Sequence, residues 1–279
     1  MQCCYINLDQ AVQRSVDIEA SFNRAARPDW SLERFSALDT AWVDAHAVAG
    51  SRSRAEKACF LSHRAVIQAH AGSARHLLVL EDDATFGVAT CEIVDGFLEQ
   101  NAGADWDLLF LDICASQIED MLTLYFNREK FMRQRTVIPL DLRNIPFFGT
   151  NAYIVNASAF EKVLACIGSG MPIDIEYDLF LAKLVREGLL KAAVLFPFLT
   201  TLSQHANASQ IQRQSVDTVN LARNLFRNMM WVESNPASFS AGMQELEKAV
   251  DRSGHGQLAK ILIAMCIDAG DPGFNSDPA

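Results

Sequence analysis

Leu77-Leu78-Val79-Leu80-Glu81-Asp82-Asp83-Ala84 is a short apolar run that ends in three adjacent carboxylates. Four consecutive apolar residues fit a strand that is buried on both faces, and open α/β sheets bind ligands at the carboxyl ends of such strands. Side chains alternate along an extended chain, so Glu81 and Asp83 face the same side. Two co-facing carboxylates repel each other unless a cation lies between them. The stretch therefore suggests a divalent ion with oxygen ligands, Mn²⁺ or Mg²⁺ rather than Zn²⁺, and a solvated acidic turn is the alternative.

Composition narrows the class of protein. The chain has 279 residues, half of them hydrophobic, which is enough for a large core. Its net charge of -10 argues against nucleic acid or an anionic membrane as the main partner. No apolar run approaches the roughly 20 residues of a membrane span, and the N-terminus lacks a signal-peptide pattern. We therefore expect a soluble, cytoplasmic protein, with peripheral association at the inner membrane as a further option. Seven scattered cysteines without a CxxC pair indicate reduced thiols.

The order of strand-like and helix-like segments predicts an α/β fold up to about residue 200. Ser53-Arg54-Ala55-Glu56 is a capping-box pattern and begins a helix that ends near Gly72. Strands are expected at 5–8, 76–80, 108–111, 152–155 and 192–196, and further helices at 10–26, 92–100, 157–167 and 174–187.

The C-terminal part has a different, helical pattern. Apolar residues recur at helical spacing over 216–231, 237–252 and 257–269, and a Gly- and Pro-containing tail follows. We predict an α/β domain over 1–214, a helical appendage over 215–270 and a disordered tail over 271–279. The appendage is expected to pack on the α/β domain or to form a homodimer contact.

Separate motifs follow one another along the chain in a fixed order. They are Tyr5-Ile6-Asn7-Leu8-Asp9 with Arg14, Ser36-Ala37-Leu38-Asp39, Glu56-Lys57-Ala58-Cys59-Phe60-Leu61-Ser62-His63, Leu78-Val79-Leu80-Glu81-Asp82-Asp83-Ala84, Trp106-Asp107-Leu108-Leu109-Phe110-Leu111 and Gly149-Thr150-Asn151-Ala152-Tyr153-Ile154-Val155. Together they resemble glycosyltransferase family 25, from residue 5 to about residue 210. The resemblance implies a GT-A-like, Rossmann-like mixed sheet flanked by helices. It further implies a UDP-sugar donor, Mn²⁺, and inverting transfer of a hexose, commonly galactose, to a glycan or glycolipid such as the lipopolysaccharide core.

The resemblance also implies roles for individual residues. Glu81 and Asp83 take the place of the family's DxD-type pair, with Asp83 on the metal and Glu81 near the ribose or a metal-bound water. His205 follows the last predicted strand, where GT-A enzymes often supply a late metal ligand, and a solvated loop histidine is the alternative. Contacts to the uridine or diphosphate are expected from Asn7, Asp9, Arg14, Asp39, Glu81 and Asp82. For Asn7 and Asp9 the alternative is capping of the first helix, with Arg14 solvated.

Inverting transfer needs a base to take the proton of the attacking hydroxyl. The segment from Pro172 to Asp178 resembles a family segment, and Asp174 or Asp178 is the candidate base. Capping or first-turn stabilisation of the following helix is an equal alternative for Asp174. His63 lies in a motif too, but a hydrogen-bonded structural histidine is the simpler interpretation.

The alternative function is a non-catalytic nucleotide-sugar or glycan-binding module on the same fold. A metal-dependent phosphohydrolase built on residues 81–83 is disfavoured, because the further Asp and His ligands of a two-metal site do not appear at recognisable spacing. The chain also departs from the family pattern at Thr40, Ala58 and Asp112, where glycine is usual or common. These departures leave the donor sugar and the acceptor open.

Overall fold

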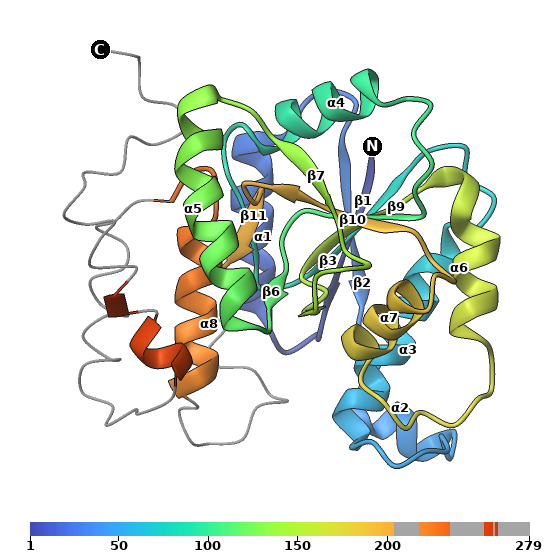
Figure 1. Ribbon diagram of the computed structural model, residues 1–279. Coiled ribbons are helices and arrows are strands. Elements are labelled where there is room, and N and C mark those ends of the chain that lie inside the picture. Colours follow the sequence, from blue (N-terminus) through green and yellow to red (C-terminus); the bar gives the residue numbers. More distant parts are fainter. Residues whose placement is uncertain (204–217, 235–253, 259, 262–279) are drawn as a thin grey trace.

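A seven-stranded mixed sheet forms the centre of the protein in the computed structural model, which describes residues 1–203, 218–234, 254–258 and 260–261 (Figure 1). Its strand order is β2-β1-β3-β9-β5-β10-β7, in which β9 and β7 run antiparallel to their neighbours. The strands are β1 (Gln2–Asn7), β2 (Ser31–Ser36), β3 (Leu77–Glu81), β5 (Leu108–Phe110), β7 (Ile138–Asp141), β9 (Ala152–Val155) and β10 (Ala192–Phe196).

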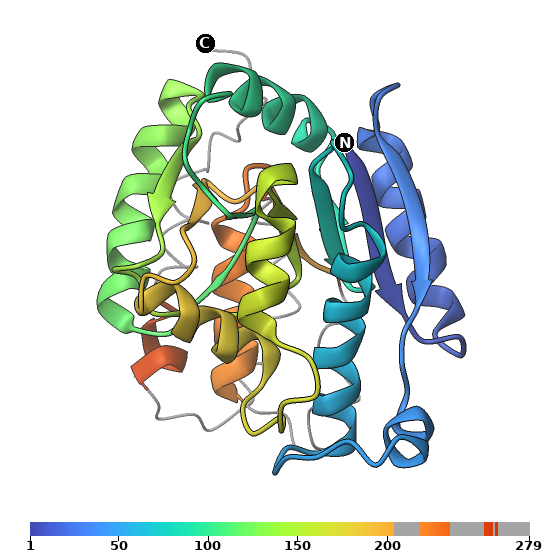
Figure 2. The ribbon, with the colours of Figure 1, turned by 90° about the vertical axis from the view of Figure 1, so that its right-hand side faces the viewer.

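Side-chain alternation divides the core between the two faces of this sheet. On β3, Leu77 and Val79 pack into one buried cluster, and Leu78 and Leu80 pack into the other. Five helices cover the first cluster: α3 (Arg54–Ala69), α5 (Ile118–Gln134), α6 (Phe160–Ile167), α7 (Tyr177–Arg186) and α8 (Thr218–Met229). Two helices cover the second cluster: α1 (Val12–Ala25) and α4 (Thr90–Gln100). Figure 2 shows α1 and α3 on the two faces of the sheet. Because both faces of the sheet are covered, residues 77–80 of β3 are all apolar and buried. The expected mixed sheet flanked by helices is confirmed.

Local signals predicted several elements well. The capping box at α3 forms as expected: the Ser53 hydroxyl accepts a hydrogen bond from the Glu56 amide, and the Glu56 carboxylate accepts one from the Ser53 amide at 2.8 Å. Strands β9 and β10 have the predicted bounds. Other elements were not predicted: β2, α5, β7, the short α2 (Thr40–Ala45), and the two small sheets formed by β4 (Ala84–Phe86) with β11 (Thr200–Leu202) and β6 (Cys114–Ala115) with β8 (Phe147–Phe148).

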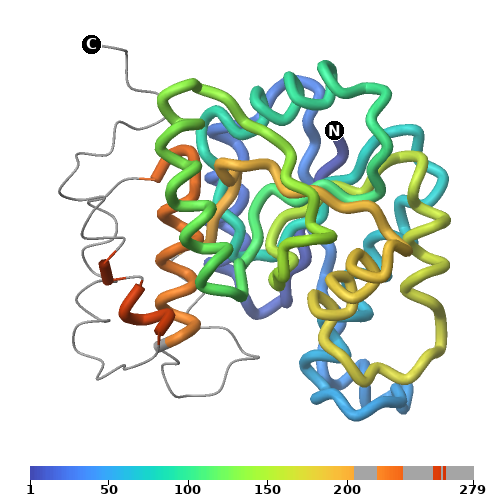
Figure 3. The backbone as a smooth tube through the Cα atoms, viewed as in Figure 1, coloured from blue at the N-terminus to red at the C-terminus, as the bar shows by residue number. Residues whose placement is uncertain are grey.

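Helix α8 is the longest described part of the expected C-terminal appendage, and it belongs to the main core. Leu225, Phe226 and Met229 are buried in the same cluster as the central strands, and the helix contacts β6 and β11. In the backbone trace of Figure 3, α8 (orange) lies beside the sheet on the side away from α2 and α3 (blue). The expected helix over 237–252 and the tail over 271–279 lie outside the described residues, as do the boundary at 214/215 and most of the third stretch. Within the described residues, no helix combines the length and apolar character needed to cross a membrane.

Candidate active site

The antiparallel direction of β9 brings its first residues to the carboxyl end of β3. Leu80 pairs with Ala152, and the amide of Glu81 donates a 2.9 Å hydrogen bond to the carbonyl of Asn151. Thr150 and Asn151, which precede β9, therefore lie beside the carboxylates that follow β3. This edge of the sheet is where open α/β sheets bind ligands.

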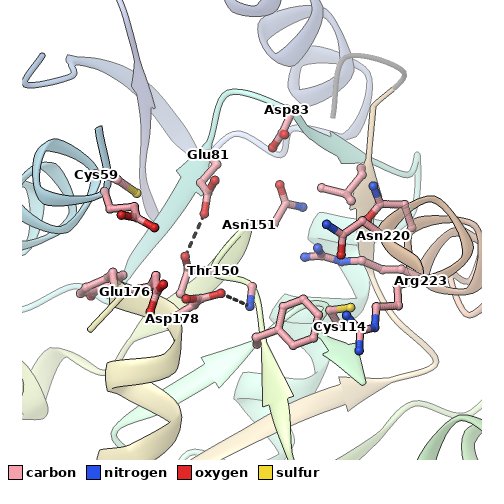
Figure 4. Close-up of a pocket in the computed structure, with 17 residues that line it drawn as sticks. Cys59, Glu81, Asp83, Cys114, Thr150, Asn151, Glu176, Asp178, Asn220 and Arg223 are labelled. Atoms are coloured by element: carbon pink, nitrogen blue, oxygen red, sulfur yellow. Dashed lines mark hydrogen bonds between the residues drawn. The ribbon is translucent and has the colours of Figure 1, made fainter. Parts of the chain in front are cut away.

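Two cavities meet at this edge. The N-terminal cavity, of about 300 Å³, is lined by the ends of β1 and α1, by residues 37–40 and by α3. The central cavity, of about 240 Å³, is lined by the segment before β9 and by α3, α7 and α8 (Figure 4). Cys59, Glu81 and Asp83 line both cavities. A ligand that spans the two cavities would thus pass the carboxylate pair.

Glu81 is held in place by neighbouring polar groups. The Thr150 hydroxyl donates a 2.8 Å hydrogen bond to its Oε1, and His63 Nε2 lies 3.8 Å from the same atom. Burial opposes ionisation of Glu81, but His63 and Thr150 favour the charged form, and the pKa of the carboxyl is lowered overall. Glu81 is therefore a fixed carboxylate at neutral pH.

The carboxyl group of Asp83 is buried and lies close to two other carboxylates. Burial, with the nearby charges of Glu81 and Asp82, raises the pKa of its carboxyl to about 7. Its Oδ1 is buried without a hydrogen-bond partner among the described residues, and so is Oδ1 of Asn151, which lines the same cavity. Unpartnered oxygens of this kind are the hard ligands that Mg²⁺ and Mn²⁺ prefer.

A bound cation would offset the repulsion between Asp83 and its acidic neighbours, and it would give the unpartnered Oδ1 of Asp83 a ligand contact. Within the described residues, no three His, Cys, Asp or Glu side chains converge on one point to form a complete metal site. Such ions, however, are commonly held by only one or two carboxylates, with substrate phosphates and waters completing the shell. Glu81 and Asp83 thus fit an ion that arrives with a diphosphate.

The two candidate bases occupy different places. Asp178 lies in the first turn of α7 and lines the central cavity, where its Oδ2 accepts a 2.9 Å hydrogen bond from the Gly149 amide. Burial raises the pKa of Asp178 above its ordinary value, although hydrogen bonds from the Gly149 and Leu179 amides act against that shift. A buried carboxylate with raised proton affinity, facing a cavity, has the properties of a general base.

Asp174 lies outside both cavities. It is exposed and accepts a 2.6 Å hydrogen bond from the Ser51 amide, which lowers the pKa of its carboxyl. The alternative of a helix cap was wrong, because α7 begins at Tyr177 and is preceded by Glu176. Asp174 instead joins the loop before α3 to the loop before α7. Its expected role as base gains no geometric support.

Of the residues expected to contact the nucleotide, Arg14, Asp39, Glu81 and Asp82 line the N-terminal cavity, and Asn7 does not. Asp82 accepts hydrogen bonds from Asn7 Nδ2 and from Arg14 Nη1, both at 2.8 Å. Asp9 does not line the cavity: it pairs with Arg34 on β2 at 2.6 Å and is largely exposed. Asp39 lines the cavity and caps α2 through a hydrogen bond from the Trp42 amide.

The suggestion that Asn7 or Asp9 caps the first helix was wrong. The N-cap residue of α1 is Ala11, which has no side-chain cap, and no acidic side chain lies in the first turn. Ala11 and Arg14 line the N-terminal cavity. The positive end of the α1 dipole is therefore open toward this cavity, as an anionic ligand requires.

His63 is a buried, hydrogen-bonded structural histidine, as the simpler interpretation of the sequence predicted. It is buried, its Nδ1 lies 3.1 Å from the Tyr153 hydroxyl, and its ring stacks on Tyr177 with centroids 4.4 Å apart. His205 lies outside the described residues, so its expected place on the metal stays a prediction.

Helix α8 supplies a wall of the central cavity that no motif indicated. Asn220, Arg223, Asn224 and Arg227 line the cavity at helical spacing. Arg227 Nη2 donates a 2.6 Å hydrogen bond to Oδ1 of the fully buried Asp112, whose Oδ2 accepts one from Asn151. Gly149, with φ +86°, is needed at this point, because a β-carbon there would lie 3.3 Å from Arg227 Nη1.

A comparison with known protein families identifies the chain as a glycosyltransferase. Residues 1–180 match the model of glycosyltransferase family 25, described as a lipopolysaccharide biosynthesis protein, and the chain belongs to this family. No curated protein sequence gives a significant match. Among solved structures, a crystal structure of the galactosyltransferase LgtC with donor and acceptor sugar analogues is 11% identical. That similarity covers 70% of this chain and 73% of the other, at a TM-score of 0.31, which is too low to support an inference about the site.

Proposed function

We propose that the protein is an inverting hexosyltransferase that moves a hexose, galactose in our proposal, from a UDP-sugar to a hydroxyl of a glycan or glycolipid such as the lipopolysaccharide core. The observation that carries this proposal is the meeting of two cavities at Glu81 and Asp83 in a member of glycosyltransferase family 25. We place the protein in the cytoplasm, at the inner membrane surface when the acceptor is a glycolipid.

In this proposal the UDP moiety occupies the N-terminal cavity. The open N-terminus of α1 and Arg14, which is paired with Asp82, would face the diphosphate, and Asp39 lines the cavity near the ends of β1 and β2. The sugar would then extend past the carboxylate pair into the central cavity. This arrangement puts the anomeric carbon at the junction of the two cavities.

Glu81 and Asp83 would hold Mn²⁺ or Mg²⁺ together with the diphosphate. When bound, such an ion stabilises the negative charge that develops on the leaving UDP. The fit rests on the unpartnered Oδ1 of Asp83 and on the proximity of two carboxylates that repel each other without a cation.

Asp178 would act as the base. The acceptor hydroxyl oxygen attacks the anomeric carbon from the face opposite UDP, and its proton passes to the Asp178 carboxylate as the new C–O bond forms. The bond from the anomeric carbon to the phosphate oxygen breaks, and its electron pair leaves with UDP. The Gly149 and Leu179 amides, which donate to the two Asp178 oxygens, orient the carboxylate for this step.

Donor hydrolysis measured across a panel of UDP-sugars, with Mn²⁺ and with EDTA, tests this proposal without knowledge of the acceptor. We expect slow release of UDP that requires the metal and is fastest for one UDP-hexose. Metal-dependent binding of UDP without turnover of any donor, with or without glycan acceptors, would instead indicate the non-catalytic binding module.

A further inference from the structure

The central cavity has walls of opposite charge. On the side of α3 and α7 it is lined by Glu56 and Asp178, with Glu81 at the sheet edge. On the other side α8 contributes Asn220 and Arg223, and Figure 4 shows these two side chains across the cavity from Asp178 and Cys59. A bound molecule with a negative group would therefore be repelled from one wall and attracted to the other.

The two arginines on the α8 wall differ in their pairing. The charge of Arg227 is matched by the buried Asp112 at 2.6 Å. Arg223, by contrast, has no carboxylate within ion-pairing distance among the described residues, and its buried Nε has no hydrogen-bond partner there. Its guanidinium carbon lies 5.1 Å from the centroid of the Phe148 ring, which also lines the cavity. Among the residues that the structure describes, Arg223 is thus an oriented cation on the cavity wall without a counter-ion.

A planar guanidinium is suited to one kind of ligand. Its fork of N–H groups matches the two oxygens of a carboxylate or phosphate, and stacking on an aromatic ring restricts its orientation. Asn220, one helical turn before Asn224 on the same wall, adds an amide that can donate to such a group. The wall therefore has the donors of an anion-binding subsite.

The donor diphosphate is a poor candidate for this subsite. In the proposed function it lies at the N-terminal cavity and the carboxylate pair, and Arg223 does not line that cavity. In the proposed function the donor hexose enters the central cavity past the carboxylate pair, the acceptor enters it from the opposite side, and the reacting acceptor hydroxyl must face Asp178. A negative group on the acceptor would then point toward α8.

We propose that Arg223 and Asn220 bind an acidic substituent, a carboxylate or a phosphate, on the acceptor sugar, so that the enzyme selects anionic glycan acceptors. This inference rests on the proposed function, because it takes the central cavity as the acceptor site. It assigns acceptor selection to α8, which lies beyond the segment that matches the family model.

Binding of three related pyranosides in the presence of UDP and Mn²⁺ tests the inference. The probes are methyl β-D-glucopyranoside, the corresponding uronic acid and the corresponding 6-phosphate, each titrated by NMR. For the wild-type protein we expect an acidic probe to bind about ten-fold or more tightly than the neutral one, as charge-assisted hydrogen bonds imply. The preference between the two acidic probes identifies carboxylate or phosphate as the group.

Variants assign that preference to Arg223. In Arg223→Gln the preference should fall to within about two-fold, whereas Arg223→Lys should retain part of it because the charge remains without the fork. Arg186→Gln, on an exposed position of α7, is the matched control and should keep the full preference. UDP affinity and thermal unfolding should be unchanged in all three variants.

Two results would overturn the inference. Equal binding of neutral and acidic probes by the wild-type protein would exclude an anion subsite for the acceptor. A loss of UDP affinity in Arg223→Gln would assign Arg223 to the diphosphate instead. If the wild-type protein did not bind UDP with Mn²⁺, the proposed function itself would be wrong. Titration with UDP alone separates this outcome from a failure of the inference about Arg223.

Discussion

Arg227 of α8 and Asp112 at the end of β5 form a buried ion pair, with 2.6 Å between Nη2 and Oδ1, 115 residues apart in sequence. Asp112 stands where the family pattern usually has glycine, and both side chains are almost fully buried. The pair joins the C-terminal helix to the edge of the sheet that carries the site. The Asp112 carboxylate also accepts a hydrogen bond from Asn151, but its cationic partner is supplied by the packing of α8.

Removal of Arg227 should destabilise the fold. Arg227→Met leaves the Asp112 charge buried and unpaired, which typically costs about 3–5 kcal/mol. Arg133→Met is a suitable control, since Arg133 pairs with Glu129 on the exposed face of α5 and should contribute less than about 1 kcal/mol. Urea unfolding of the two variants measures the difference. A loss of stability below about 1 kcal/mol in Arg227→Met would show that the pair is not needed for the packing of α8.

Asp83→Ala should abolish metal-dependent turnover of UDP-sugars without unfolding the protein. The variant removes a buried carboxylate that is repelled by Glu81 and Asp82, so we expect its melting temperature to match or exceed that of the metal-free wild type. Initial rates over a range of Mn²⁺ concentrations and thermal unfolding in EDTA are the measurements. Full turnover in the variant, or turnover by the wild type in EDTA, would refute the metal site.

Asp178 and Asp174 should differ sharply when each is changed to asparagine. Asp178→Asn removes the proton acceptor that lines the cavity, and loss of a general base commonly lowers the rate by about 10²-fold or more. Asp174→Asn changes an exposed side chain outside the cavity, so transfer should stay within a few-fold of the wild type. A large loss in Asp174→Asn with normal transfer in Asp178→Asn would reverse the assignment.

The pH dependence of transfer should report on the same base. Asp178 must be ionised to accept a proton, and burial raises its pKa above the ordinary value. The rate should therefore be constant at high pH and fall as the pH decreases through this raised pKa, earlier than for an exposed aspartate. The measurement is kcat against pH at saturating donor and metal. A rate that stays constant down to the ordinary pKa of aspartate would argue against Asp178.

Local sequence signals predicted the centre of the fold because they are short-range. The apolar run of β3 and the capping box of α3 each lie within a few neighbouring residues. Strand β2 was missed because Ser31–Ser36 is mostly exposed and polar, and its extended form depends on pairing with β1. Helix α5 ends at Gln134 and is followed by Arg135 in the left-handed conformation (φ 49°), so the glycine that usually marks a helix end is absent.

Part of the site could also be predicted from local sequence patterns, and the rest depends on contacts between distant parts of the chain. Glu81 and Asp83 were recognisable because their spacing along one strand fixes their common direction. The sequence could not decide between Asp174 and Asp178 as the base, because that choice depends on α7 beginning at Tyr177 rather than three residues earlier. Arg223 and Arg227 could have been noticed only as the polar face of an amphipathic helix, and nothing local places that face against β5.

A crystal structure with UDP and Mn²⁺ bound is the most direct test of the central claim, that a nucleotide sugar binds across the two cavities through the carboxylate pair. We expect an anomalous manganese peak roughly 2 Å from a carboxylate oxygen of Asp83 and from diphosphate oxygens, with the uridine in the cavity lined by Asp39 and Arg14. Uridine bound elsewhere, or manganese bound away from both Asp83 and Glu81, would contradict it.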